Sequence, residues 1–327
     1  MYKEDLKFSL WADFIERDYL DNEFKELINK GIINGATSNP AIFKNAILSS
    51  DAYIKQLESL DALTPKQKYE AVAIFDIQKA ADILLPLYEK GDDGYVSIEV
   101  DPSLCDDAEA TIDEGKRLFK TIDRKNVMIK VPATEAGYKA MEALSASGIP
   151  VNATLIFKKE QAIACAEAFA KGVQTYGQKV DTVISIFVSR VDRALDAHLA
   201  EHNIPTALTG IYNSASIYSA IEAMKVEGCR ALFASTGVKD DSLEAHYYIE
   251  KLLAYNSVNT APVETIEAFV ENGTCNEAAL PIAPEIIQAH MQKVQESGVN
   301  MDEVLDKLIV DGLEAFKEAF KEILEAL

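Results

Sequence analysis

The chain has 327 residues, of which 48% are hydrophobic and 26% are charged, an ordinary globular composition. This length fits either two domains or one large α/β barrel. The formal net charge of −21 argues against nucleic acid or an anionic membrane as a partner. An anionic substrate would therefore need a local cluster of lysine and arginine side chains.

The sequence shows no segment typical of export or membrane insertion. Its N-terminus is charged without an apolar signal core, and no apolar run approaches the ~20 residues that span a bilayer. The cysteines are widely spaced and form no C-x-x-C pair, so neither a disulfide framework nor a zinc site is indicated. We expect a cytoplasmic protein. The cysteines are Cys105, Cys165, Cys229 and Cys275.

Short apolar runs alternate with longer helical patterns along the whole chain. Eight βα units without a hairpin signal favour a (β/α)8 TIM barrel over a doubly wound sheet. Helical insertions are expected at residues 51–90 and 192–225, and no low-complexity linker divides the chain. We therefore expect a single barrel domain over residues 1–327. The expected strands are residues 6–13, 35–39, 95–100, 127–133, 151–157, 182–189, 231–236 and 257–261.

Two helices carry specific predictions. Residues 158–171 predict a helix that stops at Gly172, because glycine commonly follows a helix C-terminus. Residues 301–327 have apolar side chains at helical spacing and predict a C-terminal helix. Core packing or a subunit contact explains this apolar stripe better than a functional site does. The stripe consists of Leu305, Leu308, Ile309, Leu313, Phe316, Phe320, Ile323 and Leu327.

Lys130 lies in the apolar run 126–134 (NVMIKVPAT), which is typical of a buried parallel strand. An ammonium group in such a run must reach water, find a counter-charge or lose its proton. A neutral amine held away from water is the nucleophile that forms a Schiff base with a carbonyl. The alternative is a lysine near a strand end that extends to solvent.

Polar side chains recur late in the other apolar strands, where a barrel carries its active site. Single residues have structural explanations: Asp13 and Asn39 can begin helices, and Glu99 can pair with a core cation. One lysine, two carboxylates and several amides and hydroxyls at strand ends together favour catalysis. The polar residues are Asp13, Thr37, Asn39, Glu99, Asn152, Thr154, Ser185 and Ser235.

Two stretches resemble the signature motifs of transaldolases, namely residues 35–43 (GATSNPAIF) and 127–134 (VMIKVPAT). The similarity extends through LWAD at 10–13, VSIE at 96–99, NAT at 152–154 and SIFVSR at 185–190. It covers most of the chain and is looser after Arg190. The resemblance implies a Schiff-base barrel that moves a dihydroxyacetone unit between sugar phosphates without a cofactor or metal.

The resemblance implies a reaction of the non-oxidative pentose phosphate pathway: sedoheptulose 7-phosphate and glyceraldehyde 3-phosphate give erythrose 4-phosphate and fructose 6-phosphate. By position, Lys130 matches the Schiff-base lysine. Glu99 matches the carboxylate that acts through a water molecule, and Thr154 the residue that positions this water. Asp13 matches the acid/base group for the C4 hydroxyl. A homodimer is our candidate assembly.

The remaining matched positions concern substrate binding. Asn39 and Asn152 match the amides that hold the dihydroxyacetone hydroxyls, and Ser185 matches a residue of the pocket wall. Arg190 and Ser235 match the phosphate contacts. The chain departs from the family where a second arginine commonly follows the serine of the seventh strand. It reads STGVK at 235–239, so Lys239 is the candidate replacement.

Three alternatives stay open. Fructose-6-phosphate aldolases share the lysine but tend to carry Gln and Tyr where this chain has Glu99 and Phe187. A non-catalytic barrel that binds sugar phosphates would keep Arg190 without needing the lysine and both carboxylates. A metallopeptidase is suggested only by HLAEH at 198–202, which fits H-x-x-E-H but is better explained as a solvated helix face.

Overall fold

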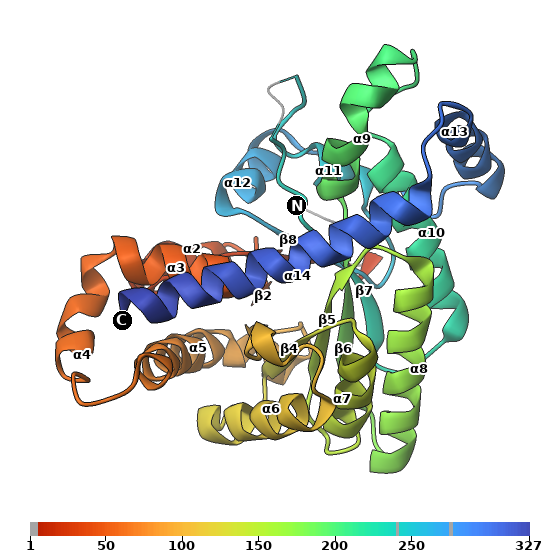
Figure 1. Ribbon diagram of the computed structural model, residues 1–327. Coiled ribbons are helices and arrows are strands. Elements are labelled where there is room, and N and C mark those ends of the chain that lie inside the picture. Colours follow the sequence, from red (N-terminus) through yellow and green to blue (C-terminus); the bar gives the residue numbers. More distant parts are fainter. Residues whose placement is uncertain (1–5, 240–241, 275–276) are drawn as a thin grey trace.

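The computed structural model describes residues 6–239, 242–274 and 277–327. Within these ranges, eight parallel strands close into a barrel in chain order (Figure 1). The predicted (β/α)8 barrel is therefore confirmed, and every expected strand lies within a few residues of its predicted ends. The strands are β1 (Ser9–Ala12), β2 (Gly35–Ala36), β3 (Tyr95–Glu99), β4 (Val127–Pro132), β5 (Val151–Ile156), β6 (Thr182–Phe187), β7 (Cys229–Ala234) and β8 (Val258–Ala261).

Helices surround the barrel and connect its strands (Figure 1). The two expected insertions are helical: α4 and the long α5 follow β2, and α9 and α10 follow β6. None of the described helices is long and apolar enough to cross a bilayer. The α-helices are α1 (Arg17–Asp21), α2 (Glu23–Asn29), α3 (Pro40–Ser49), α4 (Ile54–Glu58), α5 (Pro65–Lys90), α6 (Ala108–Ile122), α7 (Glu135–Ser145), α8 (Lys159–Tyr176), α9 (Ser189–Glu201), α10 (Thr209–Met224), α11 (Tyr247–Lys251), α12 (Val263–Asn272), α13 (Pro284–Glu296) and α14 (Met301–Ala326).

The alternation of side chains along β4 decides which way Lys130 points. Val127, Ile129 and Val131 belong to the large core between the strands and the helices. Met128 belongs to a second cluster that includes Trp11 and other residues of the barrel interior. Because side chains alternate across a strand, Lys130 shares the inward face with Met128. The Lys130 amine therefore points into the barrel.

The prediction that a helix stops at Gly172 was wrong. Helix α8 continues to Tyr176, and Gly177 follows it in the left-handed conformation with φ of +77°. Gly172 is buried against α7, where a Cβ atom would lie 1.9 Å from Ser145 Oγ. The absence of a side chain at Gly172 permits close packing of α7 and α8. From the sequence alone, such a glycine looks the same as one that ends a helix.

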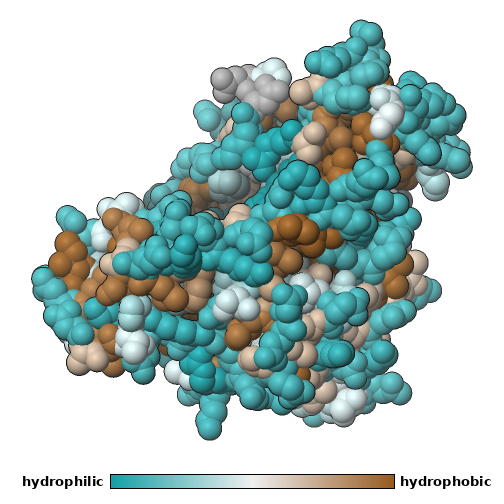
Figure 2. All heavy atoms as spheres, in the orientation of Figure 1, coloured by the Kyte–Doolittle hydropathy of each residue, from teal (hydrophilic) through white to brown (hydrophobic). Residues whose placement is uncertain are grey.

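Helix α14 runs across the molecule, past strands and helices far from it in sequence (Figure 1). Ion pairs fix it along its length: Asp306 lies 2.6 Å from Lys158 Nζ, and Glu322 lies 2.6 Å from Lys44 Nζ. Several residues of its predicted apolar stripe are buried, as expected for core packing. The mostly hydrophilic face in Figure 2 agrees with the high proportion of charged residues.

Candidate active site

A cavity of about 110 Å³ lies where the strands end at the carboxyl face of the barrel. The predicted site residues line the wall of this cavity, except Glu99, Asn152 and Lys239, which lie outside it. Strand-end loops are where (β/α)8 barrels carry their reactive groups. The lining residues are Asp13, Thr37, Asn39, Lys130, Thr154, Ser185, Phe187, Arg190, Ala234, Ser235, Thr260 and Phe316.

Lys130 reaches this cavity from the middle of the sheet. The register of the barrel pairs it with Glu99 on β3 and with Asn152 on β5. Its Nζ donates a hydrogen bond to the Ser38 carbonyl at 3.1 Å and lies 3.5 Å from Glu99 Oε2. The lysine side chain is only 6% exposed. It therefore does not extend to bulk solvent, which was the alternative left open by the sequence.

Glu99 lies behind Lys130 rather than on the cavity wall. Among the described residues, neither of its carboxylate oxygens has a hydrogen-bond partner. Burial raises the pKa of Glu99 to about 7, although the nearby Lys130 opposes the shift and Asp13 adds to it. A carboxyl group with such a pKa can both give and take a proton near neutral pH.

Asp13 follows β1 and is oriented by two threonines. Thr37 Oγ1 donates to Asp13 Oδ1 at 2.6 Å, and Thr260 Oγ1 lies 2.6 Å from Thr37 Oγ1. Because the Thr37 proton goes to Asp13, Thr260 must donate to Thr37. Burial raises the pKa of Asp13, while Lys130, the Thr37 hydrogen bond and Arg190 act in the opposite direction.

The two predicted asparagines have different surroundings. Asn39 is the N-cap of α3 and accepts a hydrogen bond from the Ile42 backbone at 3.0 Å. This bond orients the Asn39 amide on the cavity wall. Asn152 is fully buried, donates to Ser97 Oγ at 3.0 Å and accepts from Ser185 Oγ at 2.6 Å. Asn152 does not line the cavity, but its bond orients the Ser185 hydroxyl that does, and a direct contact of Asn152 with substrate stays a prediction.

A bulge in β5 aims Thr154 at the cavity. The register with β6 shifts between Ala153 and Ile156, and Leu155 has a φ of +60°. Bulges commonly redirect a side chain next to an active site. Among the described residues, the buried Thr154 hydroxyl has no hydrogen-bond partner. It is therefore free to bind a substrate or a water molecule.

Arg190 and Ser235 line the cavity from the segments that follow β6 and β7. The Arg190 guanidinium stacks 5.0 Å from the centroid of the Phe187 ring. Ser235 has a φ of +55°, and its hydroxyl lies 3.1 Å from Ser189 Oγ. Lys239 is exposed and does not line the cavity, so its assignment to phosphate binding stays a prediction.

Phe316 and Thr260 line the cavity but were not among the predicted site residues. The sequence interpretation favoured core packing or a subunit contact for the stripe that contains Phe316. Its ring centroid lies 5.7 Å from Lys130 Nζ, so one member of that stripe faces the site. Thr260 could have been found by its place near the end of the eighth strand, whereas nothing local distinguishes Phe316 from its neighbours.

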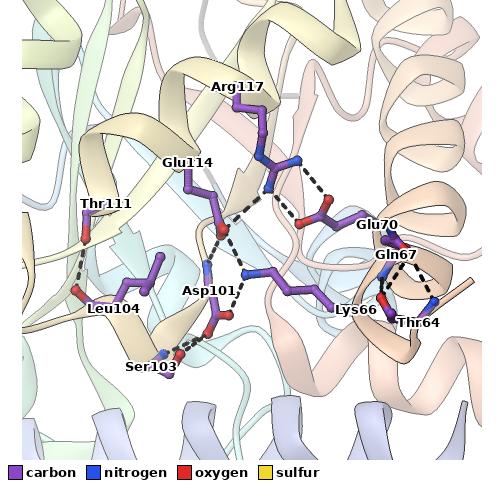
Figure 3. Close-up of polar contacts among 10 residues, drawn as sticks. All are labelled: Thr64, Lys66, Gln67, Glu70, Asp101, Ser103, Leu104, Thr111, Glu114 and Arg117. Atoms are coloured by element: carbon purple, nitrogen blue, oxygen red, sulfur yellow. Dashed lines mark hydrogen bonds and ion pairs between the residues drawn. The ribbon is translucent and has the colours of Figure 1, made fainter. Parts of the chain in front are cut away.

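A charged network fixes the segment that follows Glu99 (Figure 3). Lys66 Nζ binds Asp101 at 2.7 Å and Glu114 at 2.8 Å, and Glu114 also accepts the Asp101 backbone N–H at 2.7 Å. Arg117 extends the network by a bidentate pair with Glu70. The network joins α5 and α6 to the end of β3. It therefore anchors the strand that holds Glu99.

The H-x-x-E-H histidines do not form a metal site in the described structure. His198 Nε2 lies 3.1 Å from the Ser297 carbonyl, and His202 Nδ1 lies 2.9 Å from the His198 carbonyl. His198 lies on α9 and His202 caps its C-terminus, and neither lines the cavity. Across the described residues, no group of three or more His, Cys, Asp or Glu side chains is arranged to hold a metal ion.

A parallel barrel with a buried lysine and two carboxyl groups at its carboxyl end defines a (β/α)8-barrel enzyme. Comparison with known proteins identifies its family. The model of the transaldolase/fructose-6-phosphate aldolase family matches residues 10–327, and the chain belongs to this family.

Curated relatives match over almost their whole length. A transaldolase of Helicobacter pylori (strain Shi470) is 44% identical over 321 residues, which cover 98% of this chain and 99% of the relative. A transaldolase of Campylobacter jejuni subsp. jejuni serotype O:23/36 (strain 81-176) is 46% identical over 333 residues, with the same coverage. The family resemblance expected from the two signature stretches is thus confirmed.

Proposed function

We propose that the protein is a transaldolase that moves a dihydroxyacetone unit between sugar phosphates through a Schiff base on Lys130. The expected reaction converts sedoheptulose 7-phosphate and glyceraldehyde 3-phosphate into erythrose 4-phosphate and fructose 6-phosphate, in the non-oxidative pentose phosphate pathway. The main support is the buried Lys130 amine, 3.5 Å from Glu99 and on the same cavity as Asp13. Relatives named transaldolase at 44–46% identity support the same activity.

Formation of the Schiff base requires proton transfer around Lys130. The neutral amine attacks the C2 carbonyl of the donor, and the resulting carbinolamine loses water to give an iminium ion. Glu99 accepts a proton from the amine and returns one to the departing hydroxyl, through a water molecule held by Thr154. The Glu99 pKa of about 7 suits this exchange near neutral pH.

Cleavage of the donor follows from the position of Asp13. The Asp13 carboxylate takes the proton of the C4 hydroxyl, and the C3–C4 bond breaks. The electron pair of that bond moves into the iminium, which becomes an enamine. The aldose phosphate leaves. Asn39 and Ser185 hold the hydroxyls of the three-carbon unit until an acceptor aldehyde arrives and the steps reverse. The iminium is the electron sink, so the proposed reaction uses no metal or cofactor.

Arg190→Ala is expected to raise KM for fructose 6-phosphate by about 10- to 100-fold, because a hydrogen bond to a charged group contributes about 1.5–3 kcal/mol. The fixed fork of the guanidinium suits a phosphate group. The measurement is kcat/KM for fructose 6-phosphate and for unphosphorylated fructose. The ratio between the two should fall in the variant. An unchanged ratio would assign the phosphate to another residue, with Lys239→Ala as the next variant.

Borohydride trapping tests the proposed function directly. The protein is mixed with fructose 6-phosphate, reduced and digested, and its peptides are analysed by mass spectrometry. A dihydroxyacetone adduct is expected on Lys130, and it should decrease when erythrose 4-phosphate is added before reduction. If folded protein binds the substrate but gives no adduct, the Schiff-base proposal fails and the non-catalytic binding barrel becomes the better explanation.

Fructose-6-phosphate aldolase is the second candidate, since the family includes both activities. Glu99 and Phe187 favour transfer, because aldolase relatives tend to carry Gln and Tyr at these positions. The Phe187 ring packs against Phe157 and under Arg190, and carries no hydroxyl into the cavity. The products distinguish the candidates: an aldolase releases free dihydroxyacetone, whereas a transaldolase keeps it for the acceptor.

The remaining proposals concern the protein in its cell. We propose one domain over residues 1–327, a cytoplasmic location and a homodimer. Exposed apolar side chains support a subunit contact: Leu48 and Ile54 are 51% and 49% exposed. They lie on α3 and α4, at the end of the molecule where Figure 2 shows apolar residues gathered.

A further inference from the structure

Phe316 brings an apolar ring from the C-terminal helix close to the reacting lysine. The side chain is 4% exposed, lines the cavity and has its ring centroid 5.7 Å from Lys130 Nζ. Phe187 is the other large apolar side chain among the lining residues, and it packs under Arg190. The rest of that wall is polar or small. Phe316 is therefore the apolar group that faces the amine.

The backbone of α14 is held closely over this position. Gly312 lies one turn before Phe316, and a Cβ atom there would lie 2.9 Å from Leu155 Cδ2 and 3.4 Å from Arg190 Nη1. The ion pairs of Asp306 and Glu322 lie on either side of Phe316 along the helix. Because α14 also buries Leu305 before the ring and Phe320 after it, the ring has a defined place in the cavity wall.

In the proposed reaction, the enamine that remains on Lys130 after cleavage has two fates. It can attack an acceptor aldehyde, which completes transfer. Alternatively, its C3 carbon takes a proton from solvent, and the iminium so formed adds one water molecule at C2. The C–N bond then breaks, which gives free dihydroxyacetone and restores the Lys130 amine. Exclusion of water therefore selects transfer over release.

We propose that Phe316 is a specificity-determining residue, which keeps bulk water, as distinct from the water molecule held by Thr154, away from the enamine on Lys130 until the acceptor arrives. This inference rests on the proposed transaldolase function and adds to it a residue supplied by the C-terminal helix. The ring covers the amine without offering a proton donor or acceptor. Replacement by a smaller side chain opens space beside the amine, which water can enter because the neighbouring lining residues are polar.

The test compares two products of the same intermediate. Full-length wild type, Phe316→Leu and Phe316→Ala are supplied with fructose 6-phosphate and erythrose 4-phosphate. Free dihydroxyacetone and sedoheptulose 7-phosphate are then measured by chromatography. The ratio of dihydroxyacetone to sedoheptulose 7-phosphate is expected to rise several-fold in Phe316→Ala and by less in Phe316→Leu. Loss of folded protein lowers both products together, so it does not change this ratio.

Ile323→Ala is the matched control, because Ile323 is fully buried on the same helix but does not line the active-site cavity. It should leave the ratio at the wild-type value. An unchanged ratio in both Phe316 variants overturns the inference, and so does an equal rise in Ile323→Ala. Wild type that makes no sedoheptulose 7-phosphate and traps no adduct instead overturns the proposed function itself.

Discussion

Lys130→Met is expected to lower kcat for transfer by about 10⁴-fold or more, which is the scale seen when a covalent nucleophile is removed. Methionine keeps an unbranched side chain of similar length in the buried position of β4. It cannot form an iminium ion, so the cleavage step loses its electron sink. The measurement is the rate of sedoheptulose 7-phosphate formation, together with the absence of a borohydride adduct.

A matched lysine separates loss of chemistry from loss of folding. Lys79 is partly buried on α5 and pairs with Asp21, away from the cavity. Lys79→Met is therefore expected to retain wild-type turnover and the full adduct. If Lys130→Met kept more than about 1% of wild-type transfer, its loss would be less than about a hundredfold. Another group would then supply the nucleophile.

Which side chains of the fourth strand share a face with Lys130 could be predicted, whereas the inward direction of that face follows from the packing of Met128 in the structure. A period of two fixes which strand residues share a face, and the apolar run fixes which strands are buried. The same reasoning predicted that Asp13, Thr154 and Ser185 meet at the carboxyl end, since every parallel strand ends there. Both predictions need only the local pattern of apolar and polar residues and the rule that all strands of a parallel barrel end at the same face.

The depth of each residue at the site could not be predicted in this way. Glu99 and Asn152 lie behind the wall because the barrel register sets them beside Lys130 rather than above it. The bulge at Leu155 shifts the register between β5 and β6 and lies against Gly312 of α14, and the apolar run 151–157 carries no sign of it. Phe316 is far from Lys130 in the chain, and its apolar stripe only predicts that one face of α14 is buried.

Glu99→Gln is expected to lower transfer by about 10²- to 10⁴-fold, the range for loss of a general acid–base group. Glutamine has nearly the same shape but cannot exchange a proton near neutral pH. The amide still reaches toward Lys130 on the neighbouring strand, so the substrate should bind. Transfer rates and borohydride adducts over a range of pH provide the measurement, with slow formation of the adduct as the expected signature.

The same substitution should change how folding stability depends on pH. The pKa of Glu99 is about 7 in the folded protein against an ordinary 4.5, mainly because the group is buried. Between these values the folded state keeps a proton that the unfolded chain has lost, so this group's contribution to stability falls as pH rises from about 4.5 to about 7. Each pKa unit corresponds to about 1.4 kcal/mol, so the full change is about 3 kcal/mol.

Glu99→Gln lacks this titration. Its stability relative to wild type should therefore increase by about 3 kcal/mol between pH 4.5 and pH 8, as measured by urea unfolding at both pH values. Glu318→Gln, on an exposed side of α14, provides a control that should keep the wild-type pH dependence. An equal stability difference at both pH values would mean that Glu99 is ionised in the folded protein throughout this range. In that case the attraction of Lys130, and not burial, would set the charge of Glu99.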